Sequence, residues 1–245
     1  LRKGSATVNE YYYWMIAVGL ILLAVGLLVG FFLHQKLAAA RIRLAEQNTR
    51  EVAEEAKKSF VEKFWDLDRN FLFDVVTDGQ KDAFLRPNQI FAVSLDFSML
   101  DDTQSEAVVK VVEHKLWNEF GLRTLSADDN GYIGKYRGDE NQRNNAYHNG
   151  TLWPWLLGPF TTAFLKVKRH DSRWRGYALQ KFLLPFFEKT VYQDGLGSVS
   201  EVFDGDEPHL PRGCIAQAWS VAEPLRAFVE DILLKRPSFE GKVDL

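Results

Sequence analysis

WMIAVGLILLAVGLLVGFFL, residues 14–33, is a run of twenty residues without a charged side chain, and the reading of the whole chain depends on it. A helix rises about 1.5 Å per residue, so roughly 20 apolar residues are enough to cross the hydrocarbon core of a bilayer. Tyr11, Tyr12, Tyr13 and Trp14 lie at one end of the run, and such rings favour the membrane interface. The sequence therefore predicts a transmembrane helix over residues 14–33, preceded by a short segment, residues 1–13.

The alternative for this run is a secretory signal peptide, but its apolar stretch would be shorter and would end at a small-residue cleavage site. Basic residues are more numerous after the run than before it, and positively charged flanks stay in the cytoplasm. We therefore expect a single-pass membrane protein with its C-terminal domain in the cytoplasm. The residues compared are Lys36, Arg41, Arg43 and Arg50 after the run, and Arg2 and Lys3 before it.

Residues 34–59 form a charged segment without glycine or proline, rich in the strong helix formers Ala, Glu, Lys and Arg. Glu54 and Lys58 have the favourable i,i+4 spacing with the acid first, which predicts a helical stalk or a weak coiled coil. Over residues 14–58 the chain resembles the N-terminal anchor and coiled coil of ribonuclease Y. The His170-Asp171 pair lacks the further ligands of that nuclease's metal site, so the resemblance is confined to the anchor.

Composition restricts the class of function. The chain has 245 residues, of which 30 are basic and 33 acidic, so it lacks the general positive field that drives nucleic-acid binding. Its single cysteine, Cys214, cannot form an internal disulfide or a cysteine-based zinc site, which suits a reducing compartment. Asp204, Asp206 and Glu207 do not follow the spacing of an EF-hand loop and are interpreted as solvated acids. We expect no cofactor, no metal ion and no nucleic-acid partner.

The soluble part, residues 60–235, consists of apolar stretches with helical period, separated by clusters of Gly, Asp and Asn. In the stretch that opens at Thr103, Glu106 completes a capping-box pattern. Alternating polar and apolar patterns are absent, so the predicted class is all-α with about six helices, followed by a tail, residues 236–245.

Three more helices are predicted over residues 151–167, residues 173–191 with a kink at Pro185, and residues 214–234 with a kink or early turn at Pro224. The last of them has a predicted buried stripe of Trp219, Ala222, Leu225, Phe228, Val229 and Ile232.

YHNGTLWPW, residues 147–155, follows a polar loop predicted over residues 132–147. It combines hydroxyl, imidazole and amide groups with two indoles, the mixture that carbohydrate sites use for sugar hydroxyls and for the apolar side of a pyranose. The alternative is that Trp153 and Trp155 are only core anchors. A second motif, GSVSEVFDGD at residues 197–206, places Glu201 among small and apolar neighbours, where a carboxylate can be tuned as an acid or base. The alternative for Glu201 is a helix cap.

Seven blocks, in order along residues 60–229, resemble the C-terminal glucosidase domain of glycogen debranching enzymes, the amylo-α-1,6-glucosidases. The resemblance implies an (α/α)6 toroid, of which about six helices are present, and an inverting hydrolase that removes the α-1,6-linked glucose of a branch stub. It further implies that Glu201 is the general base and that the partner is an α-glucan such as glycogen or limit dextrin. The implied substrate contacts are Tyr147, His148, Asn149, Trp153, Trp155, Arg86, Asn88, Gln217 and Trp219. The blocks are residues 64–65, 72–75, 86–92, 121–126, 147–155, 200–205 and 212–220.

The family's general acid lies in an upstream segment that has no counterpart before Phe64, where the anchor and stalk stand instead. We therefore expect an incomplete toroid that is a natural fusion, a gene remnant or an assembly artefact, with little activity by itself. Asp66, Asp74 or Glu140 would have to donate the proton if activity is brisk. An open apolar face would favour self-association or a partner half-domain. Two alternatives remain open: a membrane-tethered glucan-binding or scaffold protein without turnover, and a membrane-anchored RNA-processing assembly factor.

Overall fold

The computed structural model describes residues 4–192 and 195–235. The chain forms two compact units, Leu1–Ala56 and Lys57–Leu245. The predicted tail, residues 236–245, and the first three residues of the predicted segment 1–13, Arg2 and Lys3 among them, lie outside the described residues.

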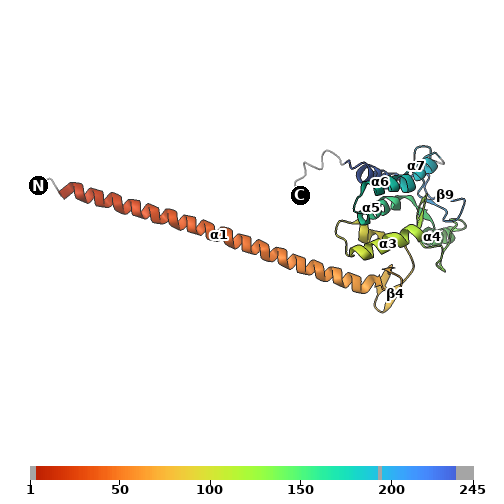
Figure 1. Ribbon diagram of the computed structural model, residues 1–245, viewed down its shortest axis with the longest axis horizontal. Helices are drawn as coiled ribbons and strands as arrows, with labels where there is room; N and C mark the ends of the chain where they lie inside the picture. Colours follow the sequence, from red (N-terminus) through yellow and green to blue (C-terminus); the bar gives the residue numbers. More distant parts are fainter. Residues whose placement is uncertain (1–3, 193–194, 236–245) are drawn as a thin grey trace. The chain divides into compact units, whose positions relative to one another are not determined.

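Helix α1 (Gly4–Phe64) is one continuous helix and makes up the described part of the first unit (Figure 1). The described side chains between residues 10 and 33 are all exposed, and Leu27, for example, is 67% exposed. By length and composition α1 is able to cross a membrane, although signal sequences pass the same test. The helices predicted over residues 14–33 and 34–59 both lie within α1, whereas the membrane anchor stays a prediction.

The described part of the chain is mostly helical, which confirms the predicted class and is compatible with an (α/α)6-like fold, and the second unit consists of short helices and shorter strands. Two short elements, η1 and η2, are 3-10 helices, and two others, η3 and η4, are π-helices. The helical elements are η1 (Pro87–Ile90), α2 (Phe91–Ser94), α3 (Asp102–Lys115), α4 (Glu140–His148), η2 (Pro154–Leu156), α5 (Leu157–Val167), α6 (Ser172–Ala178), η3 (Leu179–Leu183), α7 (Leu184–Thr190), α8 (Ala218–Arg226) and η4 (Ala227–Ile232).

Helix α5 lies at the centre of the unit and contacts α2, α3, α6 and α8. Its sequence is apolar on almost every side, and Phe160, Ala163 and Phe164 are buried in the main core. The helix was predicted to begin near residue 151 but begins at Leu157. Residues 152–153 pair in a sheet, and Pro154 opens a 3-10 turn before the α-helix starts.

The helix predicted from Thr103 is confirmed as α3, but its cap is different. Asp101, not Thr103, is the N-cap, and its carboxylate accepts from the backbone N–H of Gln104 at 2.7 Å. The Gln104 side chain accepts from the Asp101 N–H in return, so Glu106 is not part of the capping box. Asp and Thr side chains are both able to accept a hydrogen bond at the N-cap position.

A π-helix divides the first of the two helices predicted near the C-terminus and follows the second. Element η3 ends just before Pro185, whose missing N–H and bulky ring prevent regular helical bonding. Helix α8 starts at Ala218 instead of residue 214, and η4 follows it after Pro224. The predicted buried stripe is therefore correct at Phe228 and Ile232, which pack against the main core, and wrong in α8 itself: Ser220 and Pro224 are buried there, while Leu225 is 49% exposed.

Strands of two or three residues complete the unit, too short to show an alternating pattern in sequence. Five of them form an antiparallel sheet in chain order, β5 to β9. Leu152 of β7 lies opposite Phe203 of β8, so the sheet brings residues 147–155 next to residues 197–206. The strands are β1 (Trp65–Asp66), β2 (Phe71–Leu72), β3 (Val75–Thr77), β4 (Gln80–Asp82), β5 (Trp117–Asn118), β6 (Gly121–Arg123), β7 (Leu152–Trp153), β8 (Val202–Phe203) and β9 (Pro211–Arg212).

The loop predicted over residues 132–147 is only partly a loop. Its second half forms α4, capped by Asp139, whose carboxylate accepts from the Gln142 N–H at 2.9 Å. Its first half is fastened to the turn after β8, because the Tyr132 hydroxyl donates to Asp206 Oδ1 at 2.9 Å. The polar residues of this stretch therefore position Tyr147 at the end of α4.

Candidate active site

The β8–β9 hairpin presents Glu201 directly before β8. Val202 pairs with Arg212 across the hairpin, and the backbone N–H of Glu201 donates to the carbonyl of Cys214 at 2.9 Å. The Ser220 hydroxyl, on the first turn of α8, donates to the Glu201 carbonyl at 3.4 Å. The backbone of Glu201 is thus fixed from two sides, and its side chain is partly exposed.

Each carboxylate oxygen of Glu201 has one neutral hydrogen-bond donor. The Tyr147 hydroxyl donates to Oε1 at 2.5 Å, and the backbone N–H of Cys214 donates to Oε2 at 2.9 Å. A carboxylate oxygen offers about two lone pairs, so each oxygen keeps acceptor capacity after these bonds. The carboxylate is held in place and is still able to accept a proton.

The surroundings also set the charge of this group. Burial alone would raise the pKa of Glu201, but the hydrogen bonds from Tyr147 and from the backbone and thiol of Cys214 together lower that pKa below its ordinary value. Burial and the same hydrogen bond raise the pKa of Tyr147, and the hydrogen bond to Glu201 raises the pKa of the Cys214 thiol. At neutral pH the carboxylate is therefore ionised and both neighbours are neutral.

Glycine permits this arrangement at Gly213, the residue before Cys214. Its φ is +68°, and a Cβ there would lie 2.5 Å from Glu201 Oε2 and 3.0 Å from Glu201 Cβ. Any larger residue at this position would displace the carboxylate from the Cys214 N–H. A second close approach occurs where a Cβ on Gly205 would lie 2.1 Å from the Gly150 carbonyl, so the two sequence motifs meet at the level of the backbone.

Aromatic side chains pack beside Glu201 in one continuous cluster. The Tyr147 ring packs edge-on against Trp153 at a centroid distance of 4.6 Å. Trp219 lies 5.5 Å from Trp153 and stacks on Trp155 at 5.3 Å with an interplanar angle of 16°. Trp153 is nearly buried, whereas Trp219 is 40% exposed. Trp153 is therefore a core anchor, whereas Trp219 presents an accessible indole face.

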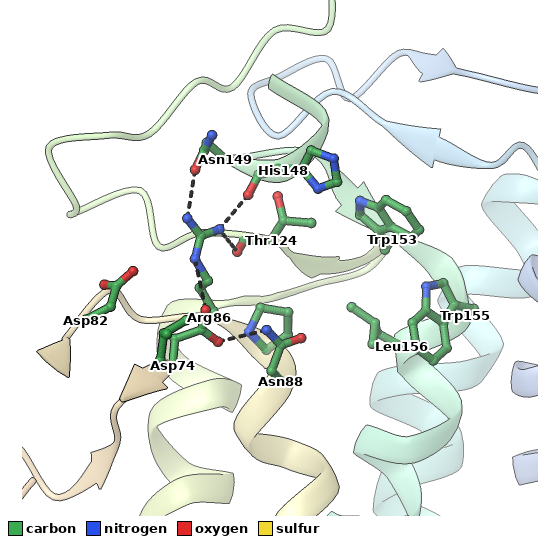
Figure 2. A pocket seen from close by; sticks show the side chains of 12 residues that line it. Asp74, Asp82, Arg86, Asn88, Thr124, His148, Asn149, Trp153, Trp155 and Leu156 are labelled. Carbon is green, nitrogen blue, oxygen red and sulfur yellow. Dashed lines mark hydrogen bonds and ion pairs between the residues drawn. The ribbon is translucent and has the colours of Figure 1, made fainter. Parts of the chain in front are cut away.

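A cavity of about 520 Å³ lies next to this cluster, lined by six of the predicted substrate contacts (Figure 2). Its polar groups are largely bonded to one another. Arg86 donates to Asn149 Oδ1 at 2.8 Å, to the carbonyls of Thr124 and His148, and pairs with Asp74 at 3.5 Å. Asn88 donates to the other oxygen of Asp74 at 2.7 Å. The six contacts in the lining are Arg86, Asn88, His148, Asn149, Trp153 and Trp155.

The other four predicted residues are not in that lining. Glu201 and Tyr147 bond to each other, Trp219 stacks on Trp155, and Gln217 is the N-cap of α8, where its side chain accepts from the Ala218 N–H at 3.0 Å. Gln217 thus has a structural partner within its own helix. Sequence reasoning missed Asp82 and Thr124, which line the cavity from segments outside both motifs.

Asp204 corrects a prediction, because it is not a solvated acid. It is 1% exposed and accepts from Arg212 Nη2 at 3.0 Å and from the backbone N–H of Tyr136 at 2.8 Å. Arg212 sits across the hairpin from Val202, so the pair closes the β8–β9 turn. The burial of Asp204 was not predictable from sequence, because the two-residue strand before it is too short to show an alternating pattern.

The family description "Amylo-alpha-1,6-glucosidase" matches residues 20–226, most of the chain. The chain belongs to this family. The match begins upstream of residue 60, where the sequence resemblance was expected to start, and it includes part of the apolar run. As a member of the amylo-alpha-1,6-glucosidase family, the second unit is a glycoside hydrolase-like domain.

Among solved structures, this family member is similar to neutral trehalase Nth1 from Saccharomyces cerevisiae, with 15% sequence identity and a TM-score of 0.48. The aligned region covers 80% of this chain and 36% of the trehalase chain. The chain thus spans about a third of the length of that structure.

Proposed function

We infer that the second unit acts on the α-1,6-linked glucose stubs of glycogen or a related α-glucan, with Glu201 as the general base. The observation that carries this proposal is the state of the Glu201 carboxylate: ionised, oriented by two neutral donors, and next to an exposed indole. An inverting hydrolase needs such a carboxylate to deprotonate the attacking water. Trp219 offers the flat apolar surface against which a pyranose packs.

The three acids expected as alternative proton donors are bonded to other groups or lie on the surface. Asp74 lies in the cavity, but Asn88 and Arg86 occupy its two oxygens. Asp66 is buried and accepts from the N–H groups of Asp68 and Arg69, and Glu140 is exposed in the first turn of α4. We therefore expect this chain by itself to release glucose slowly, since an absent general acid costs on the order of 10² to 10⁴ in rate.

A second candidate function is a membrane-tethered glucan-binding or scaffold protein without turnover. The exposed apolar stretch of α1 favours a tether, and the same aromatic cluster would bind glucan without a proton donor. The two candidates differ in chemistry but share a ligand, so binding alone does not separate them.

The test measures glucose release from phosphorylase limit dextrin by the purified full-length chain in detergent. Glu201→Gln is compared with Glu188→Gln, a matched change at an exposed glutamate of α7. Release that Glu201→Gln abolishes and Glu188→Gln preserves supports the glucosidase. Co-sedimentation with glycogen without any release supports the non-catalytic candidate, and absence of both overturns the glucan assignment.

We also infer that residues 14–33 anchor the chain in a membrane, that residues 34–59 form a ribonuclease Y-like stalk, and that residues 60–235 lie in the cytoplasm. The exposed apolar helix and the basic residues that follow it support this topology. Exposed apolar side chains on α8, Val221 and Leu225 among them, support self-association or a partner half-domain. Recovery of the full-length chain in the soluble fraction without detergent would contradict the anchor.

A further inference from the structure

Tyr147 is implied by the family resemblance to contact sugar, yet its hydroxyl is already bonded to Glu201 Oε1 at 2.5 Å. We propose that Tyr147 is a positioning residue, which fixes the orientation of the Glu201 carboxylate instead of binding sugar through its hydroxyl. This inference rests on the proposed function for its catalytic consequence, but the contact itself is a property of the fold.

The structure leaves Tyr147 little freedom to do anything else. Its carbonyl accepts from the Thr151 hydroxyl at 2.9 Å and from Trp153 Nε1 at 3.3 Å. Its ring packs edge-on against Trp153 on one side and lies 6.1 Å from the ring of Tyr136 on another. Because backbone and ring are both fixed, the hydroxyl is directed at one acceptor.

The Tyr147 bond and the Cys214 N–H bond together determine the rotation of the carboxylate. A single donor would allow the group to turn about its last torsion, whereas one donor on each oxygen holds the carboxylate plane. Gly213 allows the second donor to approach this closely. Orientation matters for a general base, since a misplacement of about 1 Å costs on the order of 10² in rate.

Both donors to Glu201 in these bonds are neutral. Their hydrogen bonds stabilise the ionised carboxylate, and no ion pair with a basic side chain is needed. The titratable groups that face Glu201 are Tyr147 from α4 and Cys214 after β9, and Tyr136 lies beside Tyr147 with ring centroids 6.1 Å apart. Among the described residues, no lysine, arginine or histidine contributes to the pKa of Glu201. Removal of the Tyr147 hydroxyl should therefore raise that pKa, because one stabilising hydrogen bond is lost.

Tyr147→Phe tests the proposal, with Tyr136→Phe as the matched control. The ring of Tyr136 lies beside the ring of Tyr147, and the one hydrogen bond of Tyr136 to another described residue is donated by its backbone N–H to Asp204. The first readout is the carboxyl-carbon titration of the full chain labelled at glutamate, with the Glu201 signal assigned by its loss in Glu201→Gln. We expect Tyr147→Phe to move the Glu201 midpoint to higher pH and Tyr136→Phe to leave it in place.

The second readout is glucose release from limit dextrin. Tyr147→Phe should lower kcat at neutral pH about tenfold to 10²-fold with little change in KM, and should move the acid limb of the pH profile upward. An unmoved Glu201 midpoint would overturn the proposal, as would a raised KM with unchanged kcat, which is the signature of a sugar contact. If the parent chain releases no glucose but the midpoint moves, the positioning contact stands and the proposed function fails.

Discussion

The two acids of the β8–β9 hairpin, Glu201 and Asp204, are three residues apart but lie in different environments. Asp204 is 1% exposed and is paired with Arg212, while Glu201 is partly exposed and accepts hydrogen bonds from two neutral donors, the Tyr147 hydroxyl and the Cys214 N–H. When a buried carboxylate is paired with a guanidinium, its acceptor oxygens are occupied by contacts that stabilise the fold. A carboxylate held by neutral groups is oriented and yet able to accept a proton, so the partner of an acid is a better guide to chemistry than its place in a motif.

The largest effect expected from this contrast is on stability. Asp204→Asn leaves the Arg212 guanidinium without its buried partner and should lower the free energy of unfolding by about 3 kcal/mol. Glu201→Gln keeps an acceptor and should cost about 1 kcal/mol or less. Urea unfolding of both variants measures the difference, and equal costs would break the distinction between the two acids.

A second test sharpens the Glu201 side of the comparison. Gly213→Ala places a methyl group against the carboxylate and strains a φ of +68°, whereas Gly197→Ala strains a φ of +94° in open space. Both variants should lose roughly 1–2 kcal/mol of stability from backbone strain. Only Gly213→Ala should also reduce glucose release or shift the Glu201 titration. Equal behaviour of the two variants in both assays would show that the close approach at Gly213 is without consequence.

A smaller effect is expected at the aromatic cluster. Trp219→Ala removes an indole that is 40% exposed and stacked on Trp155, and should weaken co-sedimentation with glycogen several-fold while costing about 1 kcal/mol of stability. Trp174→Ala is the control, since Trp174 packs on Phe164 and Tyr177 away from the site. Glycogen binding that falls equally in both variants would indicate general destabilisation and no specific role for Trp219 in binding.

The smallest effect concerns pH. The pKa of Glu201 is lowered in the folded chain, so its ionised form stabilises the fold above the unfolded value near 4.5, and this contribution is lost as the pH falls through the folded pKa. The stability difference between the parent and Glu201→Gln should therefore shrink between neutral pH and about pH 3. Free energies of unfolding at several pH values measure it. A difference that grows on acidification would contradict the assigned direction.

The long helices were predictable from sequence because their periods extend over many residues. Helix α1 has no breaker after Gly30, and α3 repeats apolar residues at helical spacing. The short strands were not predictable, since two-residue strands carry no pattern, and the start of α8 was misplaced because Gln217, not a residue near 214, is its N-cap. The start of α5 was missed for a similar reason, because Leu152 and Trp153 are apolar in either a strand or a helix.

The site divides in the same way. Glu201 and the residues 147–155 came from motif and family resemblance, and the fold brings Tyr147 to Glu201 across 54 positions. No local pattern signals that Arg86 bonds to Asn149, or that Asp204 is buried against Arg212, because both contacts depend on how distant segments meet. Glycines at sites of close approach, such as Gly213, were the available signal that backbone and side chain come together there.

The stacked indoles of Trp155 and Trp219 give the molecule a built-in optical probe. Two chromophores with centroids 5.3 Å apart and planes inclined by 16° share their electronic excitation, so their absorption carries a paired circular-dichroism signal. Trp219 is open to solvent while Trp155 is not exposed, and a molecule resting on Trp219 would change the emission of both. Occupancy beside Glu201 can therefore be followed in the unlabelled chain by its own fluorescence.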